Sequence, residues 1–412
     1  MQNTLNKVLE RIKPNKAEEQ EVNARINSTL AKISSGLKDA KAILGGSGEK
    51  GTWLKDANDA DIFVKFNYNK FKDKSDQLSS ILEKHLKKKF SKLIKLHGSR
   101  DYFQIIQDGF TLEIVPILDI KKAEDAKNIT DVSPLHAEWV NKKGKNIKDE
   151  IRLAKQFCKA NKAYGAESYI KGFSGYICEV LTIHYGSFLN LIKNAAKWSN
   201  KIVIDTEKYW KNKNILMELN KSKTYSPLVL IDPVQADRNA AAALSDEKFE
   251  IFRQACRNFL KNPYEKFFEI KKESLEDIKK KAANNDLILL KVQPQKGKVD
   301  VIGSKLLKAF EFIKSQFEKN DFKILSSDWL WSKEALFYFI IKKERLSGAI
   351  KHIGPPLKIE KHAEIFKKKY KNTFVENGKL CAKIKRKYMK PEALIKSLKK
   401  HEYLKDRVQS IK

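Results

Sequence analysis

The feature that most constrains this 412-residue chain is a glycine-rich loop followed closely by two aspartates. The loop, residues 45–52, reads GGSGEKGT, and its glycines let the backbone approach an anion closely. Exposed N–H groups and Lys50 can then hold a triphosphate. Asp59 and Asp61 lie two residues apart on a predicted strand, so both side chains point to the same side and can share hard cations. The pattern indicates a phosphate loop that leads into a strand bearing two carboxylates.

A long amphipathic helix is predicted ahead of the loop. Apolar residues recur every three or four positions from Val22 to Leu44, which is the periodicity of one buried helix face. We expect Gly45 and Gly46 to end this helix.

Glu113 is the candidate third carboxylate. It lies in the β-rich run 110–117, which has the length of a strand and is expected beside the strand of Asp59 and Asp61. Three carboxylates and such a loop suggest nucleotidyl transfer with two Mg²⁺ ions roughly 4 Å apart, one activating a hydroxyl and one stabilising pyrophosphate. A D-x-D pair alone is more often a solvated turn or a helix cap, but the loop and the later acid favour the metal site.

The charge balance indicates a polyanionic partner. Lys and Arg number 83 against 51 Asp and Glu, a net charge of +32. A membrane surface is the rival partner, but the longest apolar runs, such as 335–341, have the length of strands, and no secretory signal is recognised.

The cysteines favour a reducing compartment. None of them forms a C-x-x-C pair or has a histidine at zinc spacing, so we expect buried thiols in a cytoplasmic protein without structural zinc. They are Cys158, Cys178, Cys256 and Cys381.

The order of predicted elements suggests an α/β head. A lysine-rich helix over 74–96 is followed by strands over 101–107 and 110–117, joined by an Asp108-Gly109 turn. Helices over 146–161 and after 171–176 follow, then a strand over 228–234 and a helix capped by Ser245. Beyond Pro263, strands over 287–292 and 335–341, helices over 306–318 and 361–369, a hairpin at 377–378 and basic clusters at 367–369 and 383–388 suggest RNA-binding units.

Together these motifs resemble the archaeal, class I CCA-adding enzymes, which are tRNA nucleotidyltransferases of the polymerase-β superfamily. The resemblance covers about residues 20–260 and is looser beyond. Residues 130–136 (TDVSPLH) are similar to a T-D-R-[ST]-P-x-H stretch, with Val132 in place of the usual Arg and Ala137 in place of a second His. The longest match is 152–188, and 232–239 (DPVQADRN) also recurs in related poly(A) polymerases.

The resemblance implies roles for the loop and the acids. Asp59 and Asp61 would hold both metal ions, and Glu113 would complete the site of the ion that activates the 3′-hydroxyl. Ser47 and Lys50 would grip the triphosphate.

The resemblance also implies nucleotide contacts from His136, Lys155 and Tyr164. From the residues alone, a capped loop histidine, a solvated lysine and a core tyrosine are the simpler interpretations. Arg238 would read the base, since its planar guanidinium can donate two hydrogen bonds to a base edge. An ion pair of Arg238 with Asp232 or Asp237 is the alternative.

The expected fold is therefore α/β and multidomain. It comprises a polymerase-β-like nucleotidyltransferase head (1–145), a helical neck that recognises the base (146–263), and an α/β body and tail that bind tRNA (264–412). The expected function is addition or repair of the 3′-terminal CCA from CTP and ATP, without a nucleic-acid template.

Two alternatives stay open at this point. One is an enzyme that adds only adenylates or part of CCA, and the other is a non-catalytic RNA-binding protein on the same scaffold. The expected partners are tRNA, CTP and ATP, with no membrane and with a homodimer left open.

Overall fold

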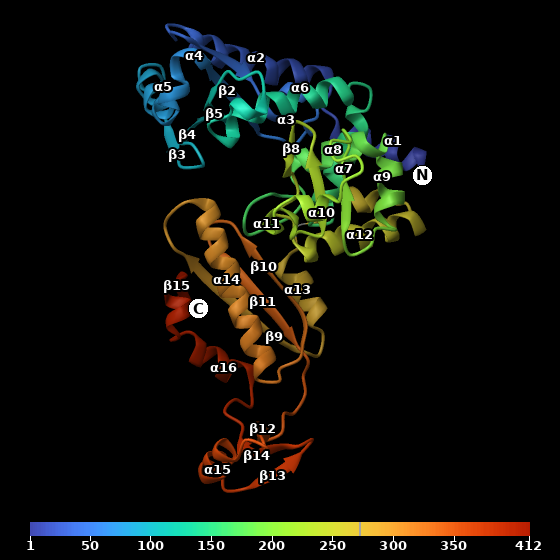
Figure 1. Ribbon diagram of the computed structural model, residues 1–412, viewed down its shortest axis with the longest axis vertical. Helices are drawn as coiled ribbons and strands as arrows, with labels where there is room; N and C mark the ends of the chain where they lie inside the picture. The colour runs from blue at the N-terminus through green and yellow to red at the C-terminus, as the bar shows by residue number, and fades with distance from the viewer. Residues whose placement is uncertain (272) are drawn as a thin grey trace. The chain divides into compact units, whose positions relative to one another are not determined.

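The computed structural model describes residues 1–271 and 273–412. The chain forms two compact units, the first being Met1–Lys271 and the second the rest of the chain. The three-part division at residues 145 and 263 stays a prediction. Each unit is described by itself below (Figure 1).

The first unit begins with a five-stranded mixed sheet. Its strand order is β1-β2-β5-β4-β3, and only the central pair β2–β5 is parallel. Helices α2 and α5 bury Ile26, Ile33, Leu82 and Leu86 in the same core as the strands. The strands are β1 (Ala40–Leu44), β2 (Asp59–Phe66), β3 (Ile94–Leu96), β4 (Tyr102–Gln107) and β5 (Phe110–Leu118), and the helices are α2 (Lys16–Ser34), α3 (Gly46–Lys50), α4 (Tyr68–Phe71) and α5 (Leu78–Lys87).

The single long helix predicted over 22–44 is wrong. Helix α2 ends at Ser34, and residues 40–44 form strand β1 instead. Gly36 and Asp39 adopt positive φ angles, which interrupt the helix between the two elements. Residues 40–44 gain a ladder of backbone hydrogen bonds with β2, where Leu44 lies opposite Ile62.

The lysine-rich helix predicted over 74–96 is correct only in its middle. A 3-10 segment, η1 (Lys72–Gln77), precedes α5, and Lys74 within it leaves helical geometry. Helix α5 ends at Lys87, and Ile94–Leu96 pairs with β4 as strand β3. The hairpin predicted at Asp108-Gly109 is confirmed, with β4 and β5 antiparallel.

The remainder of the first unit is mostly helical. Helices α1, α7, α8, α9 and α12 share one apolar cluster, called here the helical core, in which Phe157, Phe188 and Phe259 are fully buried. The elements are α1 (Gln2–Ile12), η2 (Ala123–Asp125), η3 (Ile129–Val132), α6 (Ser133–Lys143), α7 (Lys148–Ala160), α8 (Gly175–Tyr185), α9 (Phe188–Ala195), α10 (Ile215–Glu218), α11 (Lys221–Thr224), α12 (Asp246–Lys261) and η4 (Glu265–Phe268), with a small sheet of β6 (Ile202–Ile204), β7 (Leu228–Asp232) and β8 (Gln235–Asn239).

Several predicted boundaries in this part are confirmed. The helix expected over 146–161 is α7. Gly186 ends α8 in the left-handed conformation, as expected for a helix C-terminus. The Ser245 side chain accepts a hydrogen bond from the Lys248 N–H and caps α12.

The second unit contains two sheets. In the larger, ordered β10-β11-β9-β15, α14 contributes Phe310 and Phe317 to a core on one face. Helix α13 packs Ile278 against Tyr338 and Ile340 in a separate cluster. The elements are α13 (Leu275–Ala282), β9 (Asp286–Pro294), α14 (Val299–Lys319), β10 (Ile324–Trp331), β11 (Ala335–Ile341), α16 (Pro391–Leu398), α17 (Glu402–Lys405) and β15 (Val408–Ile411), and the smaller sheet has β12 (Ala349–Pro356), α15 (Glu360–Lys369), β13 (Thr373–Glu376) and β14 (Lys379–Lys385).

The predicted elements of this unit are confirmed in place and type, with β11 found at the predicted 335–341. The hairpin at 377–378 joins β13 to β14. Among the described residues, every helix is too short or too polar to cross a membrane.

Candidate active site

Three carboxylates lie on the two central strands of the five-stranded sheet. In the parallel pairing of β2 with β5, Asp61 is directly opposite Glu113, and Asp59 is opposite Thr111. Side chains on one strand alternate between faces, so Asp59 and Asp61 share a face, and the register places Glu113 beside Asp61 on it. The structure thus brings the three predicted acids together on one face of the sheet, over its central strands.

Asp61 is the most strongly perturbed of these acids. Burial, followed by repulsion from Glu113 and Asp59, raises its pKa to about 6, and the nearby Lys50 only partly opposes this. The Gln104 side chain donates a hydrogen bond of 2.6 Å to Glu113. Negative charge is therefore crowded into a partly dry site, which is an environment that favours a bound cation.

The glycine-rich loop runs directly against Asp61. A Cβ atom added at Gly46 would lie 1.7 Å from an Asp61 carboxylate oxygen, and Gly46 has a φ of +56°. Only glycine leaves room for this approach. The Gly45 N–H also donates to the Asp61 carbonyl oxygen at 2.8 Å, so a backbone hydrogen bond holds the start of the loop against β2 at Asp61.

The donor set fits a divalent cation in its chemistry, since carboxylate oxygens are the ligands that such hard ions prefer. Within residues 1–271 and 273–412, however, no three acidic, histidine or cysteine side chains converge closely enough to hold a metal ion by themselves. Mg²⁺ is commonly held by one or two carboxylates together with substrate phosphates and water. The carboxylates thus provide part of a coordination shell that a substrate can complete.

Lys50 and Lys155 meet at one buried carboxylate, that of Glu179 on α8. Lys50 Nζ donates to one Glu179 oxygen and Lys155 Nζ to the other, each at 2.7 Å. The Thr52 hydroxyl donates to Glu179 at 2.8 Å. Burial opposes a charge on Glu179, but Lys155 and Lys50 outweigh it and lower its pKa to about 2. We refer to Lys50, Thr52, Lys155 and Glu179 as the lysine cluster.

Glu179 was missed in the sequence analysis. Its only signal was an acidic residue inside an otherwise largely apolar helix, 175–185. Such an acid is seldom buried without a partner.

Tyr164 lies beside the lysine cluster. A Cβ atom at Gly175 would be 2.9 Å from the Tyr164 hydroxyl oxygen and 3.5 Å from Lys155 Cε, so the absence of a side chain at Gly175 brings these two groups close. Burial raises the pKa of Tyr164. Ser47 lies within α3, where its carbonyl oxygen accepts the Thr52 N–H.

His136 and Arg238 both contact the buried carboxylate of Asp232. His136 Nε2 lies 3.0 Å from Asp232, and Arg238 donates to the same oxygen. The Tyr176 hydroxyl and the Val234 N–H donate to the other oxygen at 3.1 and 3.0 Å. Burial of Asp232 opposes a negative charge on its carboxylate. His136, through its hydrogen bond and its charge, and Arg238, through its charge, outweigh burial and lower the pKa of Asp232.

A cavity of about 670 Å³ opens next to this cluster. His136, Tyr176, Lys223 and Arg238 are among the residues that line it. The His136 and Tyr176 rings lie 4.3 Å apart, so one wall of the cavity is aromatic. A cavity with an aromatic wall, a guanidinium and a lysine offers both stacking and hydrogen-bond donors to a planar ligand.

Family models match three segments of the chain. Residues 25–131 match the nucleotidyltransferase domain, residues 149–269 the second domain of tRNA nucleotidyltransferase, and residues 288–409 the C-terminal domain of the CCA-adding enzyme. The CCA-adding enzyme of Nanoarchaeum equitans is 37% identical over 340 residues, which cover 82% of each chain. The chain belongs to the CCA-adding enzyme family.

Other relatives match almost the whole chain. The CCA-adding enzyme of Methanosarcina acetivorans is 30% identical over 95% of this chain and 87% of its own length, and that of Methanocaldococcus jannaschii is 32% identical over 93% and 87%. The chain is accordingly a nucleotidyltransferase of this family. Asp59, Asp61 and Glu113 all lie within residues 25–131, the segment that matches the nucleotidyltransferase domain.

Solved structures confirm the fold class expected for a CCA-adding enzyme. The Cid1 poly(U) polymerase aligns with a TM-score of 0.52 at 16% identity, over 65% of this chain and 98% of its own. A cytoplasmic RNA terminal U-transferase aligns with a TM-score of 0.51 at 16% identity over the same shares. This likeness shows the α/β nucleotidyltransferase fold alone.

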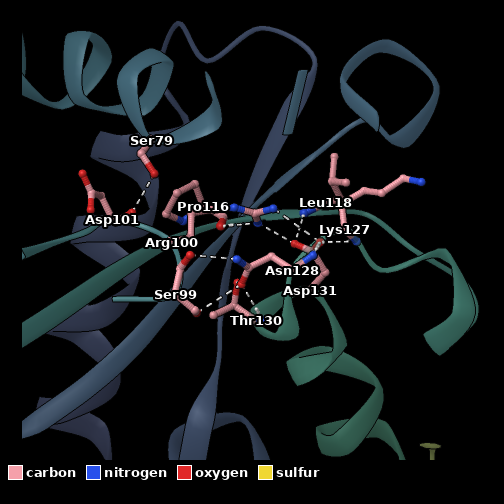
Figure 2. A network of polar contacts seen from close by, with 10 residues as sticks. All are labelled: Ser79, Ser99, Arg100, Asp101, Pro116, Leu118, Lys127, Asn128, Thr130 and Asp131. Atoms are coloured by element: carbon pink, nitrogen blue, oxygen red, sulfur yellow. Dashed lines mark hydrogen bonds and ion pairs between the residues drawn. The ribbon is translucent and has the colours of Figure 1, made fainter. Parts of the chain in front are cut away.

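A buried ion pair positions the segment that leads to His136 in this family member. Figure 2 shows Arg100 and Asp131 facing one another, and Arg100 donates to Asp131 at 2.5 Å and to the Pro116 carbonyl oxygen at 3.0 Å. Asp131 also accepts the backbone N–H groups of Leu118 and Asn128, both at 2.9 Å. The network ties the end of β5 to the turn before α6, which carries His136.

Proposed function

We propose that this enzyme builds or repairs the 3′-terminal CCA of tRNA from CTP and ATP without a nucleic-acid template. The similarity to CCA-adding enzymes over most of the chain supports this function. The observation that carries the chemistry is the parallel register that sets Glu113 beside Asp61, next to the glycine-rich loop. tRNA, CTP and ATP are then its substrates, and the cytoplasm its compartment.

The proposed cofactor is a pair of Mg²⁺ ions. Asp59 and Asp61 would hold both ions, and Glu113 would complete the site nearer the tRNA 3′-hydroxyl. The ions would activate that hydroxyl and stabilise the pyrophosphate leaving group. The raised pKa of Asp61 supports this assignment, because its carboxylate repels its neighbours until a cation is bound.

Lys50, Lys155, Ser47 and Tyr164 are proposed to hold the triphosphate and sugar of the incoming nucleotide. The two lysines lie on one carboxylate and Tyr164 lies beside Lys155, so the groups are close enough to act on one ligand. Ammonium groups in a largely buried site interact strongly with phosphate oxygens because water screens them little.

Arg238 is proposed to read the base in the 670 Å³ cavity, with His136 contacting the nucleotide. The guanidinium has five N–H donors in a planar fork, and the contact with Asp232 leaves others for a base edge. The Arg238 guanidinium can therefore keep its ion pair with Asp232 and contact a base at the same time.

Residues 264–412 are proposed to bind tRNA. Lysine and arginine outnumber acidic residues about two to one in this segment, so it can follow a phosphate backbone. The basic clusters at 367–369 and 383–388 are the candidate contacts.

The proposed function is tested with a tRNA that lacks its CCA end. The tRNA is incubated with Mg²⁺ and with each nucleoside triphosphate alone or in combination, and the product ends are sequenced. Addition of C, C and A in order is the expected result. Runs of A alone, or addition that stops after C or requires a C end, would favour the partial or poly(A)-like alternative instead.

A further inference from the structure

We infer that Glu179 is a positioning residue that holds Lys50 and Lys155 side by side as a charged pair where the triphosphate binds. This rests on the proposed function, because the lysines matter here as phosphate ligands. The inference itself depends on the lysine cluster and on how its charges balance.

The geometry gives each lysine its own carboxylate oxygen. Lys50 contacts Oε2 and Lys155 contacts Oε1, so one carboxylate sets the separation of two ammonium groups. Lys50 comes from α3 and Lys155 from α7, and no local backbone element joins them. Thr52 reinforces the arrangement, since it accepts from Lys155 and donates to Glu179, both at 2.8 Å.

The burial of the cluster is graded. The Glu179 side chain is 0% exposed, Lys155 is 5% exposed, and Lys50 is 12% exposed. A fully buried carboxylate lies deepest, and the more accessible lysine lies nearest the solvent. An incoming polyanion therefore meets the ammonium groups and is kept from the carboxylate.

The charges of the cluster do not cancel. Two ammonium groups share one carboxylate, whereas a purely structural ion pair needs only one cation. Without Glu179, two neighbouring cations in a dry site would repel each other, and burial would drive one to lose its proton. Glu179 opposes the loss of the Lys155 proton that burial favours, and two ammonium groups against one carboxylate leave one positive charge for the ligand.

The other groups that face Lys155 do not replace Glu179. Burial is the main reason that the pKa of Lys155 is lowered, and the charge of Lys50 lowers it further. Glu179 is the main group that raises the pKa of Lys155, and Cys178 on α8 is only a minor one. The Tyr164 hydroxyl is neutral near pH 7, because burial raises its pKa further above its usual value. Tyr176 offers Lys50 its ring face, with the centroid 5.8 Å from Nζ.

The test is Glu179→Gln, which keeps the volume of the side chain and removes its charge. We expect the dissociation constant and KM for ATP and CTP to rise about tenfold or more near pH 7, with a smaller change in kcat. We also expect nucleotide affinity of the variant to fall steeply as the pH rises above about 8, because Lys155 then loses its proton more easily. The wild type should show a much smaller loss over that range, because Glu179 raises the pKa of Lys155 against the effect of burial.

Two further variants separate charge from folding. Glu179→Asp keeps the charge but shortens the side chain, so it should weaken nucleotide binding while restoring the wild-type pH profile. Glu150→Gln is the matched control, because the one hydrogen bond found for the half-buried Glu150 among the described residues is from the Phe188 N–H, at 2.8 Å, and Glu150 lies outside the lysine cluster. It should leave both nucleotide affinity and its pH profile unchanged. If Glu179→Gln does not fold, the nucleotide affinity and pH profile of Glu179→Asp alone test whether Glu179 positions the two lysines.

The decisive measurement is calorimetric titration of ATP into each variant with Mg²⁺, in parallel with thermal melting. Wild-type nucleotide affinity in folded Glu179→Gln at every pH would overturn the inference. So would a pH profile shared by the Gln and Asp variants, or equal affinity losses in Glu179→Gln and Glu150→Gln. A wild type that binds ATP but adds nothing to tRNA would instead contradict the proposed function.

Discussion

Arg238 is paired with Asp232, while Asp237 forms its ion pair with Lys223. The sequence left both aspartates open as partners of Arg238. Asp232 also accepts hydrogen bonds from Tyr176 and the Val234 N–H, so it is well satisfied without the guanidinium. The Arg238 side chain is 34% exposed and borders the cavity. Its structural contribution is therefore small, and a role in reading the base remains compatible with the ion pair.

We predict that Arg238→Ala raises misincorporation of UMP or GMP into tRNA ends by about 5-fold to 150-fold. A lost bidentate contact to a base removes about 1–3 kcal/mol of discrimination. Product sequencing measures the effect, and Arg238→Lys serves as control, since it keeps the charge and loses the planar fork. Unchanged fidelity together with a lower melting temperature would assign Arg238 a purely structural role.

We predict that Asp59→Asn or Asp61→Asn lowers nucleotide incorporation by several orders of magnitude. Positioning of metal ions supplies most of the catalysis in phosphoryl transfer, and an amide binds Mg²⁺ far less well than a carboxylate. Single-turnover incorporation measures the rate, and filter binding measures tRNA affinity, which should be retained. A near wild-type rate in either variant would contradict the proposed metal site.

We predict that, without divalent cations, Asp61→Asn is more stable than the wild type at pH 7 by at most about 3 kcal/mol. Folding raises the pKa of Asp61 from 3.8 to about 6. The wild type therefore becomes less stable as the pH rises through that range, because the folded protein then has to hold a charged Asp61. The difference should vanish below pH 4. Thermal melts over this pH range measure it.

Added Mg²⁺ is the second arm of that experiment. The ion should stabilise the wild type more than the variant and so reduce or reverse the difference at pH 7. A difference that is independent of both pH and Mg²⁺ would argue against a repelled carboxylate at Asp61.

We predict that tRNA affinity falls steeply with salt. Each neutralised phosphate lowers the logarithm of the association constant by about 0.7–0.9 per decade of salt concentration. Replacing Lys383 and Lys385 by Ala should reduce this slope by about one to two units, while ATP binding stays unchanged. Affinity that hardly varies with salt would remove RNA as the explanation of the net charge of +32.

We predict that Arg100→Ala lowers the free energy of unfolding by about 3–5 kcal/mol, because it leaves the buried Asp131 carboxylate without its counter-ion. Chemical denaturation measures the loss. Lys87→Ala removes a 66% exposed partner of Glu83 and should change stability by less than about 1 kcal/mol. Equal effects of the two substitutions would contradict the anchoring role of the Arg100–Asp131 pair.

The sequence predicted those strands, helices and turns that depend on the local spacing of apolar residues and on turn-forming residues. The strand of Glu113 beside that of Asp61 was expected from the β-rich run of strand length at 110–117, and the Asp108-Gly109 turn predicted the β4–β5 hairpin. The helix over 22–44 was wrong because its apolar stripe happens to continue past Gly36. Ala40, Ala42 and Leu44 satisfy the alternation of a strand as well as the spacing of a helix, and only pairing with β2 decides between them.

The contacts of the candidate site were less predictable, because they join distant parts of the chain. Thr52 and Glu179 are 127 positions apart, and Lys50 and Glu179 are 129 apart, so no spacing in the sequence connects them. Asp237 directly precedes Arg238 and Asp232 lies six positions before it, yet Arg238 pairs with the more distant, buried Asp232. The roles of the site residues themselves stay predictions.

The separation of the lysine cluster along the chain has a consequence for synthesis. Arg100 and Asp131 are only 31 positions apart, so their network and the β4–β5 hairpin can close soon after residue 131 leaves the ribosome. Lys50 and Thr52 must wait for Glu179, which is made 48 residues after Asp131. The nascent five-stranded sheet can thus form with its carboxylates in place while Lys50, Lys155 and Glu179 are not yet assembled. A chain stalled between these two points would carry the three proposed metal ligands but lack the lysine cluster proposed to bind the nucleotide.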